Sequence, residues 1–145
     1  MNDNINIKYS FFGLWTRIYN LASSEDAASL GGIISGYLAS SYLLVLLMYI
    51  RGTPIFLSAA ESDAEYNIVI LVLLVLTTLF TYLAHRVYLK INLTPVPYIF
   101  GWFCIEMIFS TPISSPLFFI FFKILLFTIS INSLLGWLNI RKYRG

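Results

Sequence analysis

Long apolar stretches are the feature that most constrains how this chain of 145 residues can fold. Short segments between them hold nearly all of its charged residues. A helix of about 20 apolar residues is long enough to cross a hydrocarbon core of about 30 Å. A soluble domain carries roughly 25% charged residues, whereas this chain carries 11%. The sequence therefore predicts an all-α membrane protein.

The apolar stretches predict a single membrane domain, residues 1–145, with four transmembrane helices in two antiparallel hairpins. We expect the spans at residues 28–50, 66–90, 97–111 and 117–138. Residues 51–65 form the predicted outer loop, and residues 139–145 form a basic cytoplasmic tail. The third span is short, so it would cross only with little tilt or with its ends in a thinned region of the bilayer.

An amphipathic helix is predicted before the first span, at residues 11–22. At 100° per residue its apolar side chains fall on one half of the helix, while Arg17 and other polar residues fall on the opposite half. This pattern is typical of a helix in the membrane interface, with Trp15 and Tyr19 at the level of the headgroups. The alternative is a helix packed on the cytoplasmic face of the protein itself.

Basic residues are distributed unevenly between the two predicted sides. With the N-terminus inside, the outer loops hold only Arg51, and the cytoplasmic segments hold seven basic residues: Lys8, Arg17, Arg86, Lys90, Arg141, Lys142 and Arg144. Positive charge in short loops retards their translocation, so we expect both termini in the cytoplasm. The pattern favours the inner (plasma) membrane of a bacterium, with an organelle membrane as the alternative.

Two charged residues lie within predicted spans. Glu106 and Lys123 are equally far from the turn centred between Ser114 and Ser115, so an antiparallel hairpin brings them to one depth, roughly 10 Å below the outer helix ends. Each charge alone costs about 2.5–3.5 kcal/mol at a helix centre, and opposite charges at equal depth offset much of this cost. We predict an intramembrane pair that fixes the register of the hairpin. The alternative makes Glu106 a proton or cation site.

Small residues repeat every four positions in the first predicted span. Close backbone contact drives helix association in lipid, and small residues at this spacing permit it. The contact is expected either with another span of the same chain or with a partner. The predicted helix-packing face consists of Ala28, Gly31, Gly32, Ser35, Gly36, Ala39 and Ser40.

The residues available favour no enzyme. One cysteine and one histidine exclude a CxxC pair and make a metal site or cofactor unexpected, and no aspartate falls within a span. The net charge of +2 is too small to indicate nucleic acid. We expect a small multi-pass accessory or regulatory subunit that contacts the lipid bilayer and binds other membrane proteins, or a second copy, through its first span. The alternative is an oligomeric proton- or cation-linked transporter or channel subunit that uses Glu106.

Overall fold

The computed structural model describes residues 21–51, 63–110 and 116–144. Over these residues the prediction of an all-helical protein is confirmed. The helices are α1 (Leu21–Ser29), α2 (Gly31–Ile50), α4 (Asp63–Tyr88), α5 (Val96–Ser110) and α6 (Leu117–Arg144).

Helices α1 and α2 form one nearly continuous apolar helix from Leu21 to Ile50. Only Leu30 separates them, and its backbone keeps a right-handed helical conformation. The sequence prediction placed the start of this span at Ala28, but Ala28 lies inside α1. The helix starts earlier because its first turns pack against α6. Residues 21–22 of the predicted interfacial helix therefore belong to α1, and its residues 11–20 lie outside the described part.

Among the described residues, three helical segments are long and apolar enough to cross a membrane: Leu21–Ile50, Glu65–Tyr88 and Leu117–Tyr143. The fourth apolar helix, α5, has 15 residues, which at about 1.5 Å per residue is about 22 Å. Its length alone is below the about 20 residues that a complete crossing needs.

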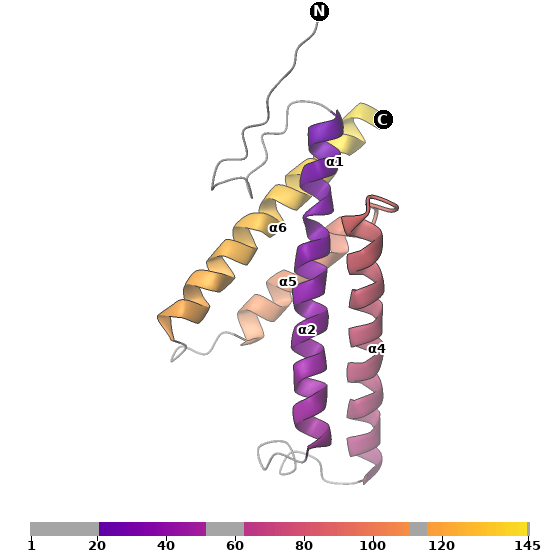
Figure 1. Ribbon diagram of the computed structural model, residues 1–145, viewed down its shortest axis with the longest axis vertical. Coiled ribbons are helices and arrows are strands. Elements are labelled where there is room, and N and C mark those ends of the chain that lie inside the picture. The colour runs from indigo at the N-terminus through magenta and orange to yellow at the C-terminus, as the bar shows by residue number, and fades with distance from the viewer. Residues whose placement is uncertain (1–20, 52–62, 111–115, 145) are drawn as a thin grey trace, which may run out of the picture.

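The helices form two unequal arms (Figure 1). In the longer arm, α2 and α4 run side by side in opposite directions. In the shorter arm, α5 and α6 lie at a slant to α2, and α6 packs mainly along α1. The beginning of α1 and the end of α6 lie at the same end of the molecule.

Helix α4 ends at Tyr88, before the predicted limit at Lys90. The amide N–H of Ile91 donates to Arg86 O and that of Lys90 donates to Val87 O, the two hydrogen bonds of a Schellman cap. Lys90 takes the left-handed conformation, with φ of 57°. Its side chain pairs with Asp26 of α1, so the cap of α4 is joined to α1.

The predicted basic tail, residues 139–145, is helical as far as Arg144. Asn139 Nδ2 donates to Ser24 Oγ at 2.8 Å, which holds this part of α6 against α1. The sequence prediction ended the fourth span at Leu138, and the helix itself continues beyond this residue. A helix can continue past an apolar stretch where a neighbour supplies polar contacts.

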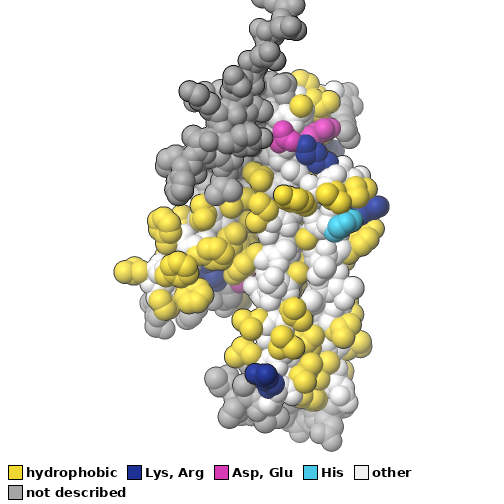
Figure 2. Space-filling view, viewed as in Figure 1, with side chains coloured by type: hydrophobic (Ala, Val, Ile, Leu, Met, Phe, Trp, Pro, Cys, Tyr) yellow, Lys and Arg dark blue, Asp and Glu magenta, His cyan; other side chains and the backbone are white. Residues whose placement is uncertain are grey.

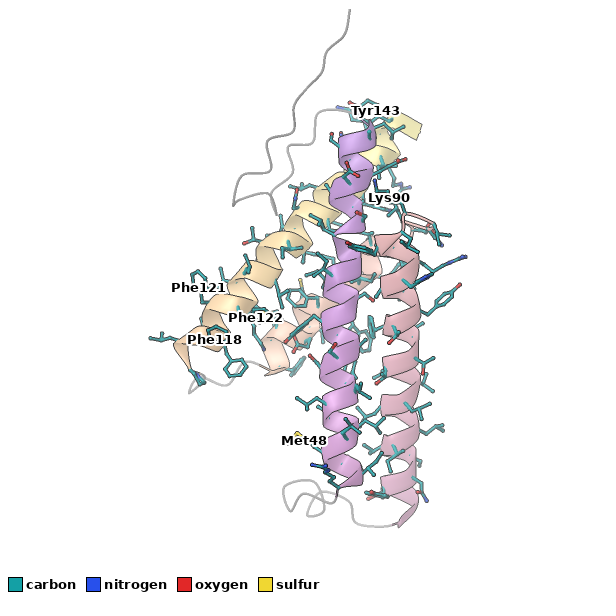
Figure 3. The ribbon with its side chains drawn as sticks, in the orientation of Figure 1. Met48, Lys90, Phe118, Phe121, Phe122 and Tyr143 are labelled. Carbon is teal, nitrogen blue, oxygen red and sulfur yellow. The ribbon has the colours of Figure 1, made fainter. Side chains whose placement is uncertain are left out.

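The outer surface is largely apolar, as expected where lipid is the solvent. Figure 2 shows hydrophobic side chains along the helices and charged side chains mainly toward the two ends of the molecule. Lys90 and Tyr143 lie near one end and Met48 near the other (Figure 3).

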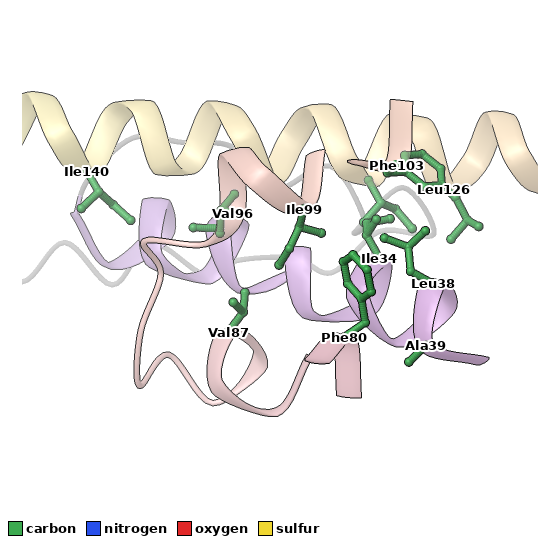
Figure 4. Close-up of a cluster of buried hydrophobic side chains, with 12 residues drawn as sticks. Ile34, Leu38, Ala39, Phe80, Val87, Val96, Ile99, Phe103, Leu126 and Ile140 are labelled. Atoms are coloured by element: carbon green, nitrogen blue, oxygen red, sulfur yellow. The ribbon is translucent and has the colours of Figure 1, made fainter. Parts of the chain in front are cut away.

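The core lies where α2, α4, α5 and α6 meet (Figure 4). Ile34 and Leu38 of α2, Phe80 of α4, Phe103 of α5 and Leu126 of α6 are buried there. Helix backbones also approach each other closely at glycines. A Cβ at Gly136 would lie 2.6 Å from Ser24 O and 2.7 Å from Ala28 N, so α6 meets the α1 backbone directly.

Gly136→Ala should therefore destabilise the protein by about 1–3 kcal/mol, because the new methyl group meets backbone atoms that cannot move aside. Gly36→Ala is the matched control, since nothing lies within 4 Å of a Cβ at Gly36. Thermal unfolding in detergent should show a lower Tm for Gly136→Ala only. Equal melting of the two variants would contradict the α1–α6 contact.

Candidate functional site: an ion pair at the junction of three helices

The two charged residues of the predicted hairpin lie together inside the bundle. Lys123 Nζ of α6 is 3.8 Å from Glu106 Oε1 of α5, and the side chains are only 10% and 12% exposed. The separation is too long for a good hydrogen bond, so the interaction is mainly one between charges. The hairpin thus places the opposite charges at one depth.

A third polar group comes from α2, and sequence reasoning missed it. The Tyr37 hydroxyl donates to Glu106 Oε1 at 3.3 Å. The Tyr37 ring meets Phe103 of α5 and Phe122 of α6 edge to face, with centroids 6.0 Å and 6.1 Å away. Tyr37 therefore connects α2 to the ion pair. A tyrosine far from both ends of an apolar span was the available signal, because its hydroxyl needs a partner there.

The pair does not lie midway along α2. Tyr37 is six residues from Gly31 and thirteen from Ile50, or about 9 Å and about 20 Å along the helix. The pair is thus near the Ser110 and Leu117 ends of its own hairpin but far from the Ile50 end of α2. The difference arises because α5 and α6 do not extend as far as α2 and α4 (Figure 1).

This arrangement brings a carboxylate, an ammonium group and a phenol to one place. Their formal charges cancel, which lowers the cost of keeping them away from water. The same three groups could also exchange a proton, since a carboxylate accepts and a phenol or an ammonium group donates. Both interpretations of the sequence therefore have a geometric basis.

Five residues of the predicted helix-packing face are buried within the chain: Ala28, Gly31, Gly32, Ser35 and Ala39. A Cβ at Gly32 would meet Ala84 O of α4 at 2.9 Å. The Ser35 hydroxyl donates to Phe80 O of α4 at 2.7 Å. Most of the predicted face therefore contacts other helices of the same chain, which is one of the two alternatives that the sequence left open.

The remaining two residues of that face point away from the bundle. Gly36 has open space around it, and Ser40 is exposed. The Ser40 hydroxyl donates to Gly36 O at 2.9 Å, so its hydrogen-bonding need is met within α2. The two positions leave a small-xxx-small surface on the outside of α2.

Helix α6 carries a complementary small face that sequence reasoning also missed. The Ser133 hydroxyl donates to Ala28 O at 2.9 Å, and Gly136 packs on α1 one turn further on. Ser130, Ser133 and Gly136 recur every three residues, which was the available signal. It does not identify the helix that the face contacts.

The predicted interfacial anchors Trp15, Arg17 and Tyr19 lie outside the described residues. Within residues 21–51, 63–110 and 116–144, no group of three or more His, Cys, Asp and Glu side chains is placed to hold a metal ion. Comparisons of the chain with protein-family models, curated proteins and solved structures give no match. Its function must be argued from its own residues.

Reversing the charges tests the ion pair. Glu106→Lys or Lys123→Glu alone places two like charges in a nearly dry site. Each should lower the free energy of unfolding by about 3–5 kcal/mol and reduce expression. The double variant Glu106→Lys with Lys123→Glu should recover much of the loss. Tyr37→Phe is the milder comparison, since it removes only the hydroxyl. A double variant no better than the singles would contradict the pairing.

Proposed function

We propose that this chain is a non-catalytic subunit of a bacterial inner-membrane complex. Its four apolar helices form two antiparallel hairpins in the bilayer, α2 with α4 and α5 with α6, and both termini are cytoplasmic. Seven basic residues against one favour this orientation. Its role is to bind another membrane protein through the open part of α2.

One observation carries this proposal: after the rest of their face is used inside the chain, half-buried Gly36 still has open space where a Cβ would lie, and Ser40 is exposed. A partner helix can approach the α2 backbone closely there, and close approach is what drives helix association in lipid. A structural role for the ion pair supports a scaffold, because its charges and Tyr37 engage one another across three helices.

Orientation can be tested with reporter enzymes fused after Arg51, Lys90 and Gly145. The Arg51 fusion should be active only as an external reporter, and the other two only as cytoplasmic reporters. The opposite pattern would overturn the orientation and with it the assignment of inner and outer ends.

Partner binding can be tested with a photoreactive side chain placed at Ser40. Val75 of α4 is the matched control. The Ser35–Phe80 hydrogen bond fixes the alignment of the antiparallel helices α2 and α4. Ser40 lies five residues after Ser35 and Val75 five residues before Phe80, so the two positions are level with each other. Val75 is 52% exposed. The probe at Ser40 should give one discrete protein adduct, and the probe at Val75 should give lipid adducts.

Gly36→Leu supplies the specificity control, because it adds bulk to this surface at a position where a Cβ has nothing within 4 Å. It should abolish the Ser40 adduct while leaving the Tm unchanged. Lipid adducts alone at Ser40 would overturn the proposal.

The Tyr37–Glu106–Lys123 contact favours a second candidate, a homo-oligomer that moves protons or cations. In that case the Ser40 adduct would be a second copy of this chain. The purified oligomer would also carry an ion flux in liposomes that Glu106→Gln abolishes.

A further inference from the structure

Arg86, near the inner end of α4, lies at a depth that the other end of the helix defines. There the rings of Tyr49 and Tyr66 stack with centroids 4.8 Å apart, and Glu65 is exposed. Tyrosines and charges are typical of a membrane–water interface, so this end marks one boundary of the hydrocarbon core. Arg86 follows Glu65 by 21 residues, or about 31 Å of helix. A core about 30 Å thick therefore places Arg86 at the opposite boundary, where the headgroups begin.

The guanidinium group of Arg86 is held in place without being neutralised. It lies 5.6 Å from the centroid of the Tyr82 ring, one turn earlier in α4, in a cation–π contact. Lys90, four residues later, is paired with Asp26. Among residues 21–51, 63–110 and 116–144, no carboxylate forms a salt bridge with Arg86. Its charge is therefore available to an anion from outside the chain.

An uncovered apolar stripe continues from Arg86 along α4 toward the other side of the bilayer. Its side chains recur every three or four residues, so they share one face of the helix, and each is 46–59% exposed. Helix α4 packs mainly on α2 and lies at one side of the molecule (Figure 1), which leaves this face open to acyl chains. We call it the α4 lipid face: Tyr82, Leu79, Val75, Val72 and Ile68.

We infer that Arg86 binds the phosphate of an anionic phospholipid of the cytoplasmic leaflet, whose acyl chains lie along the α4 lipid face. A guanidinium group can donate two parallel hydrogen bonds to one phosphate. A headgroup with a net negative charge complements Arg86, whereas the ammonium group of a zwitterionic phospholipid brings a second positive charge to the site. The inference rests on the proposed membrane embedding, and its choice of leaflet rests on the proposed orientation.

Arg141 of α6 offers a comparison with closely similar chemistry. Its guanidinium group lies 5.2 Å from the centroid of the Trp137 ring, again one turn earlier in the same helix. No carboxylate in the described part of the chain forms a salt bridge with it. The two arginines therefore differ mainly in their depth.

Contacts along the long helix formed by α1 and α2 give the depth of Arg141. Gly32 faces α4 one turn either side of Arg86, so these two residues lie level with each other. Asn139, two residues before Arg141, donates to Ser24, which precedes Gly32 by eight residues, or about 12 Å of helix. The headgroup layer on each side of the core is only about 5–8 Å thick. Arg141 therefore lies beyond the headgroups, in water.

The test uses the full chain in nanodiscs that hold anionic phosphatidylglycerol and zwitterionic phosphatidylcholine in equal amounts. A photoreactive side chain is placed at Leu79, on the α4 lipid face and about 10 Å deeper than Arg86. The lipid in each adduct is identified by mass spectrometry. A probe at Ile68, on the same face but near the other boundary, is the positional control.

The Leu79 probe should give about fivefold more phosphatidylglycerol than phosphatidylcholine adduct, the preference expected from one basic residue near the membrane surface. Arg86→Gln should reduce this excess to the equal proportions of the bilayer. Arg86→Lys should keep most of it, because the charge remains, and Arg141→Gln should keep all of it. The Ile68 probe should show no excess of phosphatidylglycerol.

Equal amounts of the two adducts at Leu79 in the unsubstituted chain would overturn the inference. An excess that survives Arg86→Gln, or that Arg141→Gln removes equally well, would also overturn it, because the selectivity would not come from a group at headgroup depth. Nanodiscs expose both faces of the bilayer, so none of these results depends on which side the termini occupy. Failure of the unsubstituted chain to enter nanodiscs of phosphatidylcholine alone would instead overturn the membrane embedding.

Discussion

Direct contact between helix backbones is the constraint on which the rest of this structure depends. Lipid tails are as apolar as the side chains that face them, so burying leucine or phenylalanine between helices gains little. Close packing and hydrogen bonds must hold the helices together. They act where Gly32 meets Ala84 and Tyr88 of α4, and where Gly136 meets α1. The Ser35 and Ser133 hydroxyls bond to backbone carbonyls beside these contacts. Both arms are therefore attached to the long helix formed by α1 and α2.

The Glu106–Lys123 ion pair joins α5 to α6, where no glycine contact holds the two helices together in the described residues. Helix α5 makes fewer contacts with its neighbours than α4 does, and the Glu106–Lys123 interaction joins it to α6. Tyr37 extends the connection to α2 through its hydroxyl and its ring. A buried charge without its counterpart would be costly in lipid, so the pair favours the one register that satisfies both residues. Specificity of assembly, rather than net stability, is what such a pair contributes best.

Much of the fold was predictable because it depends on local pattern. Apolar length indicated the helices, and the equal spacing of Glu106 and Lys123 about their turn indicated where the two charges would lie relative to each other. The small-residue repeat marked the contact surface of α2. The sequence could not indicate which helix meets which part of that surface, since Ser133 and Gly136 are more than a hundred residues from α1. Nor did it reveal that α5 and α6 end short of α2, because depth depends on how the hairpins dock. For the same reason the sequence did not indicate that the helices extend beyond the predicted spans at Ala28 and Leu138, where Asn139 of α6 donates to Ser24 of α1.

The α1–α6 contact also has a consequence for the order of assembly. Its hydrogen bonds join residues 105 and 115 positions apart, whereas the contacts between α2 and α4 bridge a much shorter segment. During synthesis the α1 surface that contacts Ser133 and Gly136 therefore stays uncovered by α6 until α6 has entered the bilayer. Among the described helices, α6 is made after α1, α2, α4 and α5, and it completes the contact with α1. Until then, a helix from another protein could occupy the same surface.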